Sequence, residues 1–181
     1  DELKRVYLNA VGGNATFLLN LPPDKRGLIP EKDAAILARL GAFIRDTFSD
    51  NLARRANITA SRDMAGHEIG NAMKPGDDEY FRTPEGTTDV RIDLSWEEPQ
   101  RIRYVALREN IFLSQRIERF EIVCQDEAGG ETLLSSGTTV GYQRIVELEK
   151  EVRARKLSVI IRDARCFVTL AHLGVYSGAQ A

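Results

Sequence analysis

The chain has 181 residues, a formal net charge of −2 and a pI of about 5.8, so it lacks the basic excess typical of nucleic-acid-binding proteins. Hydrophobic residues make up 43% and charged residues 29%, as in globular proteins, and no apolar run approaches the roughly 20 residues that a membrane span needs. His67 and His172 stand at no ligand spacing to Cys124 or Cys166, so we expect no metal site and no cofactor. Both cysteines lie in apolar segments and are expected to be buried thiols, with one disulfide as the alternative.

The first part of the chain, residues 1–47, predicts a helix, a buried strand and a second helix. Apolar side chains at three- and four-residue steps indicate a helix over residues 1–11, which the glycine pair at 12–13 is expected to end in the left-handed conformation. The apolar run 17–21 predicts a strand buried on both faces, and two prolines stop its pairing because proline has no backbone N–H to donate. A second helix is expected to begin at Pro30. This order is typical of a parallel sheet covered by helices.

The pattern changes at residues 48–55, a polar and basic stretch that predicts a linker. Short strands separated by turn residues then predict an antiparallel β-sandwich over residues 56–178. The clearest strand is 90–96, in which apolar and polar side chains alternate and Trp96 continues the apolar face into the expected core. No stretch of this part reads as a long helix, and the charged run 147–155 is the only one that could form a helix.

A helix, one strand and a helix do not make a domain, because a lone parallel strand leaves both faces and both edges without partners. We therefore expect the natural polypeptide to extend before Asp1 with most of a sheet or barrel. In isolation, the strand at 17–21 is expected to pair with the chain's own sandwich or to self-associate with a second copy.

Four segments resemble one known family. Residues 9–29, which read NAVGGNATFLLNLPPDKRGLI, resemble the end of the catalytic barrel in glycoside hydrolase family 29, the α-L-fucosidases. Residues 109–120, ENIFLSQRIERF, are similar to that family's E-x-I-x-L-G-Q-R-x-x-x-F pattern, and residues 137–145, GTTVGYQRI, resemble its G-T-T-I-G-Y-K-R-I pattern. The end of the chain, residues 162–176, resembles the family's closing segment. Phe81 stands where the family usually has Trp, and Ser114 where it has Gly, which weakens any ligand contact inferred at these two positions.

The resemblance implies a fold and a division of the chain. Residues 1–47 correspond to the incomplete C-terminal end of an (α/β)8 barrel, residues 48–55 to the linker, and residues 56–178 to a galactose-binding-like or discoidin-like sandwich of the jelly-roll type. We therefore expect a mainly β chain in which the antiparallel sandwich is preceded by a helix–strand–helix remnant of the barrel.

The resemblance also implies retaining hydrolysis of α-L-fucosides, which needs two carboxyl groups about 5 Å apart. Both catalytic positions of the family lie upstream of the matched segments. We therefore expect no catalytic residue here, and no fucoside hydrolysis by this chain alone.

Four residues are candidates for substrate contact. Asn20 ends the predicted last strand, and barrel sites form at the carboxyl ends of strands; the alternative is that it caps backbone groups there. Tyr142 and Arg144 lie in a segment bounded by glycine, and Arg116 lies in a matched motif. The alternative for the motif residues is structural, with an arginine held against a carboxylate such as Glu109 to fix a loop.

Three functions follow from these observations. The chain is expected to be the C-terminal part of an α-L-fucosidase, and its sandwich is expected to brace the rest of the catalytic barrel. The expected partners are that barrel and a fucosylated or galactosylated glycan. The alternatives are an autonomous carbohydrate-binding module and a structural sandwich without a ligand. The resemblance further implies a secreted, periplasmic or lysosomal setting, and no nucleic acid or membrane partner is expected.

Overall fold

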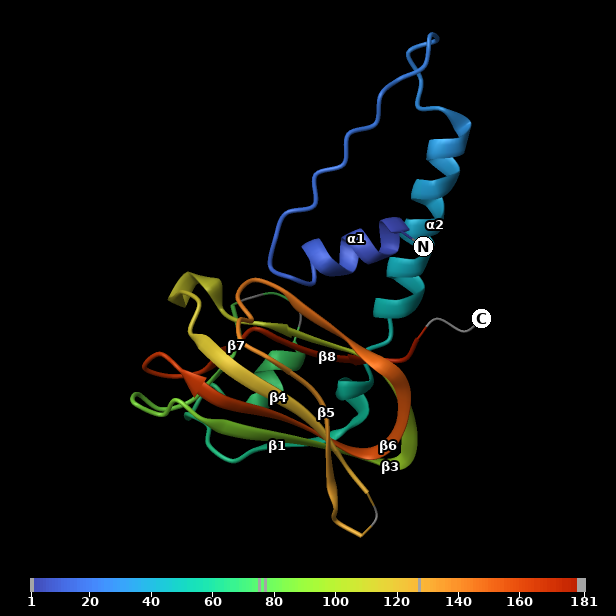
Figure 1. Ribbon diagram of the computed structural model, residues 1–181. Helices are drawn as coiled ribbons and strands as arrows, with labels where there is room; N and C mark the ends of the chain where they lie inside the picture. Colours follow the sequence, from blue (N-terminus) through green and yellow to red (C-terminus); the bar gives the residue numbers. More distant parts are fainter. Residues whose placement is uncertain (1, 75, 77, 127, 179–181) are drawn as a thin grey trace.

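The computed structural model describes residues 2–74, 76, 78–126 and 128–178, and it consists of a β-sandwich with two helices and an extended segment on one side (Figure 1). The helices are α1 (Glu2–Ala10) and α2 (Glu31–Phe48), and short 3₁₀ turns are η1 (Leu52–Arg55), η2 (Ile69–Met73) and η3 (Ile111–Leu113). The strands are β1 (Asn57–Ala60), β2 (Phe81–Arg82), β3 (Val90–Arg108), β4 (Ile117–Gln125), β5 (Glu131–Gly137), β6 (Arg144–Ala164), β7 (Thr169–Leu170) and β8 (His172–Tyr176). Within the described chain, no helix is both long enough and apolar enough to cross a membrane.

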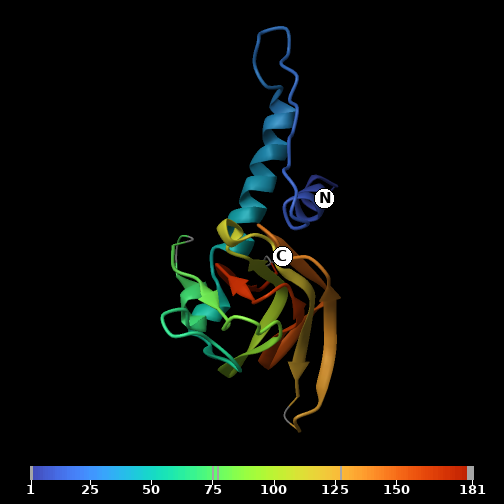
Figure 2. The ribbon, with the colours of Figure 1, turned by 90° about the vertical axis from the view of Figure 1, so that its left-hand side faces the viewer.

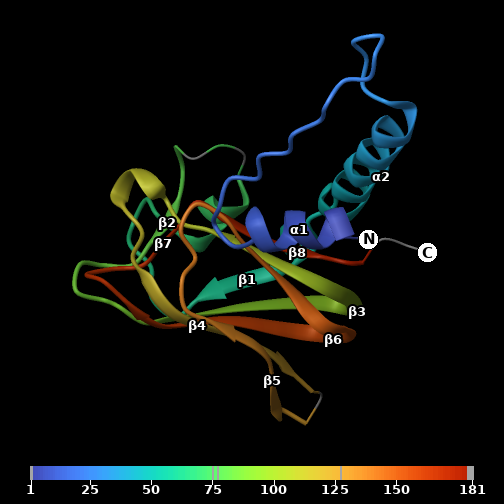
Figure 3. The same cartoon turned by 45° about the horizontal axis from the view of Figure 1, so that its top comes forward.

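All strand pairs among the described residues are antiparallel, and the two long strands β3 and β6 pair with each other inside the larger sheet. The larger sheet has the order β1-β3-β6-β4-β5, with β8 paired to β3, and β2 pairs with β7 in a second small sheet. The register between β3 and β6 shifts between Ser95 and Gln100. Before this bulge β3 pairs with β1, and after it β3 pairs with β8, so the two halves of β3 have different neighbours (Figure 3). This confirms the mainly β, antiparallel sandwich.

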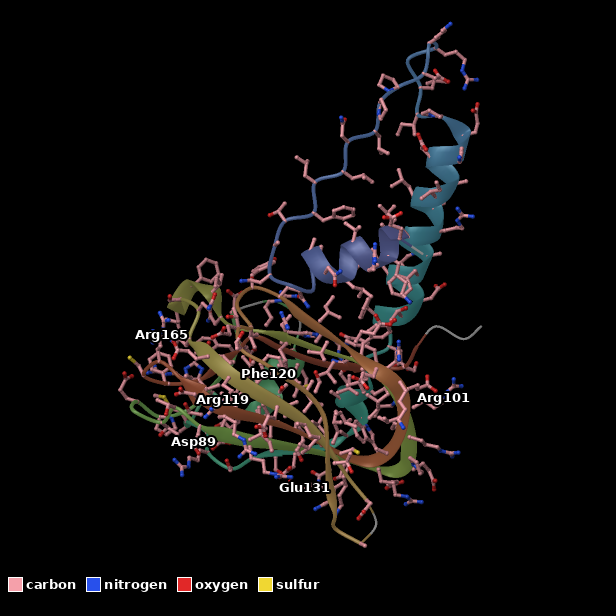
Figure 4. All side chains as sticks on the ribbon, in the orientation of Figure 1. Asp89, Arg101, Arg119, Phe120, Glu131 and Arg165 are labelled. Atoms are coloured by element: carbon pink, nitrogen blue, oxygen red, sulfur yellow. The ribbon has the colours of Figure 1, made fainter. Side chains whose placement is uncertain are left out.

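The core of the sandwich follows the period-two pattern of the sequence. Val90, Ile92 and Leu94 are each at most 1% exposed and belong to the main apolar cluster. Trp96 joins this cluster as expected, and its indole N–H donates a 2.9 Å hydrogen bond to the carbonyl of Leu52. Phe120, which is labelled in Figure 4, is fully buried, and its ring occupies the space beside the Cα of Gly137 where any side chain would clash.

Three expectations from the sequence are corrected in this part of the fold. The charged run at 147–155 is not helical but lies inside β6, where the ladder with β3 supplies its backbone partners. Cys166 is exposed rather than buried, because it lies in a turn with a φ of 65°, and Cys124 is half-buried. Both thiols are free, so the disulfide is also absent from this structure.

The two predicted helices form, and they pack on the sandwich. Helix α1 ends at Ala10, before the glycines, but the left-handed residue is Asn14, with a φ of 67°, rather than either glycine. Gly12 has a different role, because a side chain there would clash with Leu8 and Ile145. Its carbonyl accepts a 2.9 Å hydrogen bond from the backbone N–H of Ile145, which fastens the end of α1 to the start of β6.

The predicted strand at 17–21 is an extended segment that has no ladder partner among the described residues. Leu18 is 90% exposed and Leu19 is 37% exposed, so the expected burial on both faces does not occur in this chain. The expected pairing with the sandwich is also absent from this run, and the nearby bridge joins Gly13 to Arg144 instead. Figure 2 shows the segment and α2 extending away from the sandwich.

Candidate functional site

The side of the sandwich that carries α1 and α2 contains the features that bear on function. A second apolar cluster joins the helices to the outer face of the sheet. Its buried members are Leu8, Tyr104, Ala106 and Tyr176. Because Tyr104 and Ala106 alternate with core residues along β3, they face outward, and the helices cover them.

Aromatic rings form the centre of this contact. The ring of Phe48 lies 5.5 Å from that of Tyr104 and 5.1 Å from that of Tyr176, measured between centroids. Phe43 adds an edge-on contact with Tyr104 at 6.3 Å, and the ammonium of Lys4 lies 4.5 Å above the ring of Phe43. Such aromatic pairs contribute roughly 0.5–1.5 kcal/mol each beyond the area they bury. The last turn of α2 is therefore firmly attached to the sandwich.

The extended segment ends in an ordered turn at its far tip. The carboxylate of Asp24 accepts hydrogen bonds from the backbone N–H groups of Arg26, at 2.8 Å, and Leu28, at 3.3 Å. The Arg26 guanidinium also contacts Asp24 and Glu31, both at 2.6 Å, and its hydrogen bond holds the pKa of the Asp24 carboxyl below its usual value. Asn20 lies just before this turn and is exposed.

A buried carboxylate organises the loops beside β3 and β6. Glu109 is 1% exposed. Its Oε1 accepts hydrogen bonds from the backbone N–H groups of Arg116, at 2.7 Å, and Ile117, at 2.9 Å. Its Oε2 accepts the backbone N–H of Gly141 at 2.7 Å. One carboxylate therefore joins the end of β3, the start of β4 and the loop before β6.

Burial raises the pKa of Glu109, although the three backbone N–H donors act in the opposite direction. Several other carboxylates lie on the surface opposite arginines, as in the 2.7 Å contact of Glu121 with Arg162, and the hydrogen bond from Arg162 lowers the pKa of Glu121. Among the described residues, no group of three or more His, Cys, Asp and Glu side chains is arranged to hold a metal ion.

The loops held by Glu109 present two exposed rings. Phe112, at the middle of η3, is 85% exposed, and Tyr142, next to Gly141, is 56% exposed. The guanidinium of Arg108 lies 5.4 Å from the centroid of the Tyr142 ring. The backbone N–H of Tyr142 donates a 2.8 Å hydrogen bond to Oδ1 of Asn14, which links this loop to the N-terminal piece.

The structure brings three of the four predicted contact residues to one region. Tyr142 and Arg144 flank the start of β6, and the backbone of Arg116 is joined to the same loop through Glu109. Asn20 is separate, on the extended segment that leads away from the sandwich (Figure 1). The structural alternative for Arg116 fits its contacts, because its guanidinium donates to the carbonyls of Leu113 and Arg165 and stacks 3.8 Å above Phe167.

Sequence reasoning missed Phe112 and Asn14. Neither carries a charge or a spacing that signals a role, and both gain one only because Glu109 and Gly141 bring distant loops together. The loop is fixed by backbone N–H donors to the carboxylate rather than by an arginine, and the Arg165 side chain pairs instead with Glu118 at 2.6 Å.

Comparison with known proteins first defines the class of the chain. No family model matches it. The sandwich shares its fold with a family 32 carbohydrate-binding module of C. perfringens that was solved in complex with galactose. That structure has a TM-score of 0.59, is 15% identical, and covers 69% of this chain and 96% of its own. This likeness shows that the sandwich has the fold of that module.

Relatives along the whole chain are α-L-fucosidases. Alpha-L-fucosidase 1 of Arabidopsis thaliana is 32% identical over 180 residues, which are 97% of this chain and 36% of the relative. A family 29 fucosidase of Ruminococcus gnavus, solved in complex with fucose, has a TM-score of 0.92 and is 27% identical, over 99% of this chain and 37% of its own. A related structure from Bacteroides thetaiotaomicron has a TM-score of 0.94 and is 26% identical, over 98% of this chain and 39% of its own.

The chain is thus related, over nearly all of its residues, to the C-terminal region of glycoside hydrolase family 29 α-L-fucosidases. It spans about 36% of the length of the Arabidopsis relative.

Proposed function

We propose that this chain is the C-terminal part of an α-L-fucosidase, a retaining glycosidase that releases terminal α-L-fucose from glycans. The observation that carries the proposal is the apolar segment 17–21, whose residue Leu18 is 90% exposed. An apolar strand of this kind is stable only between other strands, and the related fucosidases are much longer than this chain. The remaining strands of a catalytic barrel are the partner that we propose for it.

In this arrangement the chain braces the barrel and supplies no catalytic carboxylate. Helix α2 has 18 residues, which at 1.5 Å per residue is about 27 Å, and it runs from the tip near Asp24 back to the sandwich (Figure 1). Barrel sites lie at the carboxyl ends of strands, which here is the tip. The sandwich therefore supports the opposite end of the strand, and we propose Asn20 as the predicted residue nearest to the substrate.

Hydrolysis of a chromogenic α-L-fucoside tests this proposal. The assay compares the 181-residue chain with the polypeptide that its complete reading frame encodes. We expect hydrolysis with retention by the complete polypeptide and none by the chain alone. A complete polypeptide without activity on any fucoside, or activity of the chain by itself, would contradict the proposal.

The alternative function is an autonomous carbohydrate-binding module, and it makes different claims about the partners of the chain. An autonomous carbohydrate-binding module is not favoured, because the aromatic contacts of Phe48 fix α2 to the sandwich and leave the segment 17–21 without its own cover. Calorimetric titration of the chain with fucosylated and galactosylated oligosaccharides tests that alternative, and millimolar affinity or better would support it. We also propose a secreted, periplasmic or lysosomal setting, which fractionation of the source cells would test.

Pairing of the segment 17–21 with a second copy of the chain stays a prediction, and sedimentation of the chain would measure it.

A further inference from the structure

Two loops on the helix-bearing side carry a set of exposed apolar side chains. It consists of Ile111, which is 41% exposed, Phe112, which is 85% exposed, and Tyr142, which is 56% exposed, and we call it the aromatic platform. A single exposed apolar side chain on a protein surface needs no explanation. Three of them on loops that share an internal support are different, because the structure keeps them outside the core.

The support of the aromatic platform is rigid. The side chain of Asn110 accepts a 3.2 Å hydrogen bond from the backbone N–H of Phe112 and so caps η3. Ser114 ends the turn with a φ of 73°, a conformation that is uncommon outside glycine. The buried carboxylate of Glu109 then holds both sides, because it binds the backbone of Arg116 after η3 and of Gly141 before Tyr142. The backbone that carries the exposed rings is therefore fixed by hydrogen bonds.

The aromatic platform continues the surface on which the N-terminal piece lies. Asn14, at the start of the extended segment, accepts the backbone N–H of Tyr142 at 2.8 Å, and the bridge between Gly13 and Arg144 lies beside it. Figures 1 and 4 show η3 on the same side of the sandwich as α1 and the extended segment. The loops that carry the exposed rings thus lie on the same side of the sandwich as the extended segment.

The polar groups around the aromatic platform are already used within the chain. The backbone N–H groups of Gly141 and Tyr142 bind Glu109 and Asn14, and the Arg116 guanidinium binds backbone carbonyls. A sugar site combines an aromatic face with convergent polar groups that are open to the ligand. Here the donors face inward and the apolar surface faces outward, which suits a protein partner better than a glycan.

We propose that the aromatic platform is a second contact between the sandwich and the catalytic barrel, separate from the covalent attachment through α2. This inference rests on the proposed function, because it assigns the platform to the barrel partner proposed there. The barrel surface that covers the platform is expected to be apolar, since both exposed rings offer mainly hydrocarbon. The contact would fix the orientation of the sandwich against the barrel at a point away from the end of α2.

Cysteine labelling tests this contact. In a background with Cys124→Ser and Cys166→Ser, Phe112→Cys is introduced into the chain alone and into the complete polypeptide, and maleimide labelling is timed in both. We expect fast labelling of Phe112→Cys in the chain alone and labelling slower by about tenfold or more in the complete polypeptide, where reaction must wait for local opening. The matched control is Leu133→Cys, since Leu133 is 58% exposed on β5, away from the helices, and should label equally fast in both.

Tyr142→Cys is a second reporter, so the test does not depend on one variant. Equal labelling of both reporters in the chain and in an active complete polypeptide would overturn the inference and leave the proposed function intact. Fast labelling in the complete polypeptide that becomes slow only on addition of a fucosylated oligosaccharide would also overturn it and would assign the platform to a glycan. If the complete polypeptide without these substitutions hydrolyses no fucoside, that result would instead count against the proposed function.

Discussion

Replacement of Glu109 by glutamine tests whether the buried carboxylate holds the two loops together. The glutamine side chain has the same shape, but only one of its two terminal atoms accepts hydrogen bonds. The arrangement that loses least keeps the oxygen against the N–H groups of Arg116 and Ile117 and places the amide nitrogen against the N–H of Gly141. Two donors then face each other at a buried position that was a 2.7 Å hydrogen bond.

The magnitude follows from this loss. A hydrogen bond to a charged group contributes about 1.5–3 kcal/mol, and an unsatisfied buried donor costs about 1–3 kcal/mol. The two costs overlap, and glutamine avoids the desolvation that raises the pKa of Glu109. We expect the free energy of unfolding to fall by about 2 kcal/mol, which for a domain of this size lowers the Tm by roughly 4–8 °C.

Urea and thermal unfolding at neutral pH measure this effect. Glu118→Gln is the matched control, because the ion pair of Glu118 with Arg165 lies on the surface and such pairs contribute less than about 1 kcal/mol. If Glu109→Gln is no more destabilising than the control, Glu109 does not hold the loops and the rigid support of the aromatic platform is refuted.

Three further predictions concern the same regions. Burial raises the pKa of Glu109 in the folded state above its ordinary value of about 4.5, so over this range the native state binds more protons than the unfolded state, and the contribution of Glu109 to stability falls as pH rises from about 4.5 through the raised pKa; pH-dependent urea unfolding should show this slope in the wild-type chain and not in Glu109→Gln. Phe48→Ala should destabilise the chain by about 2–3 kcal/mol, somewhat less than a fully buried phenylalanine, and speed hydrogen exchange along α2; unchanged exchange there would contradict the role given to the aromatic contact. Leu18→Asp should change the stability of the chain alone by less than about 0.5 kcal/mol, because Leu18 is 90% exposed, but should destabilise the complete polypeptide strongly in thermal unfolding; an equally small effect in both would place Leu18 outside any barrel core.

Sequence patterns were sufficient where a short stretch determines its own environment. The alternation over 90–96 places Ile92 on the inner face of any sheet that contains it, and its side chain is fully buried. The helix over the first residues also follows from spacing alone, as α1 confirms. The sequence predicted an extended conformation for the apolar segment 17–21, and the segment is extended. Its burial, however, depends on neighbouring strands, and among the described residues none pairs with it.

Features that join distant residues were decided only by the tertiary structure. The exposure of Cys166 depends on a left-handed turn, and the cover over Tyr104 depends on how α2 packs on the outer face of β3. The role of Glu109 requires donors from residues 7, 8 and 32 positions away along the chain. The sequence alone therefore determined the two helices, the alternating strand at 90–96 and the family resemblance, because local spacing and composition carry that information. The loops, the aromatic platform and the attachment of the helices were decided by the fold, because each depends on contacts between residues far apart in the chain.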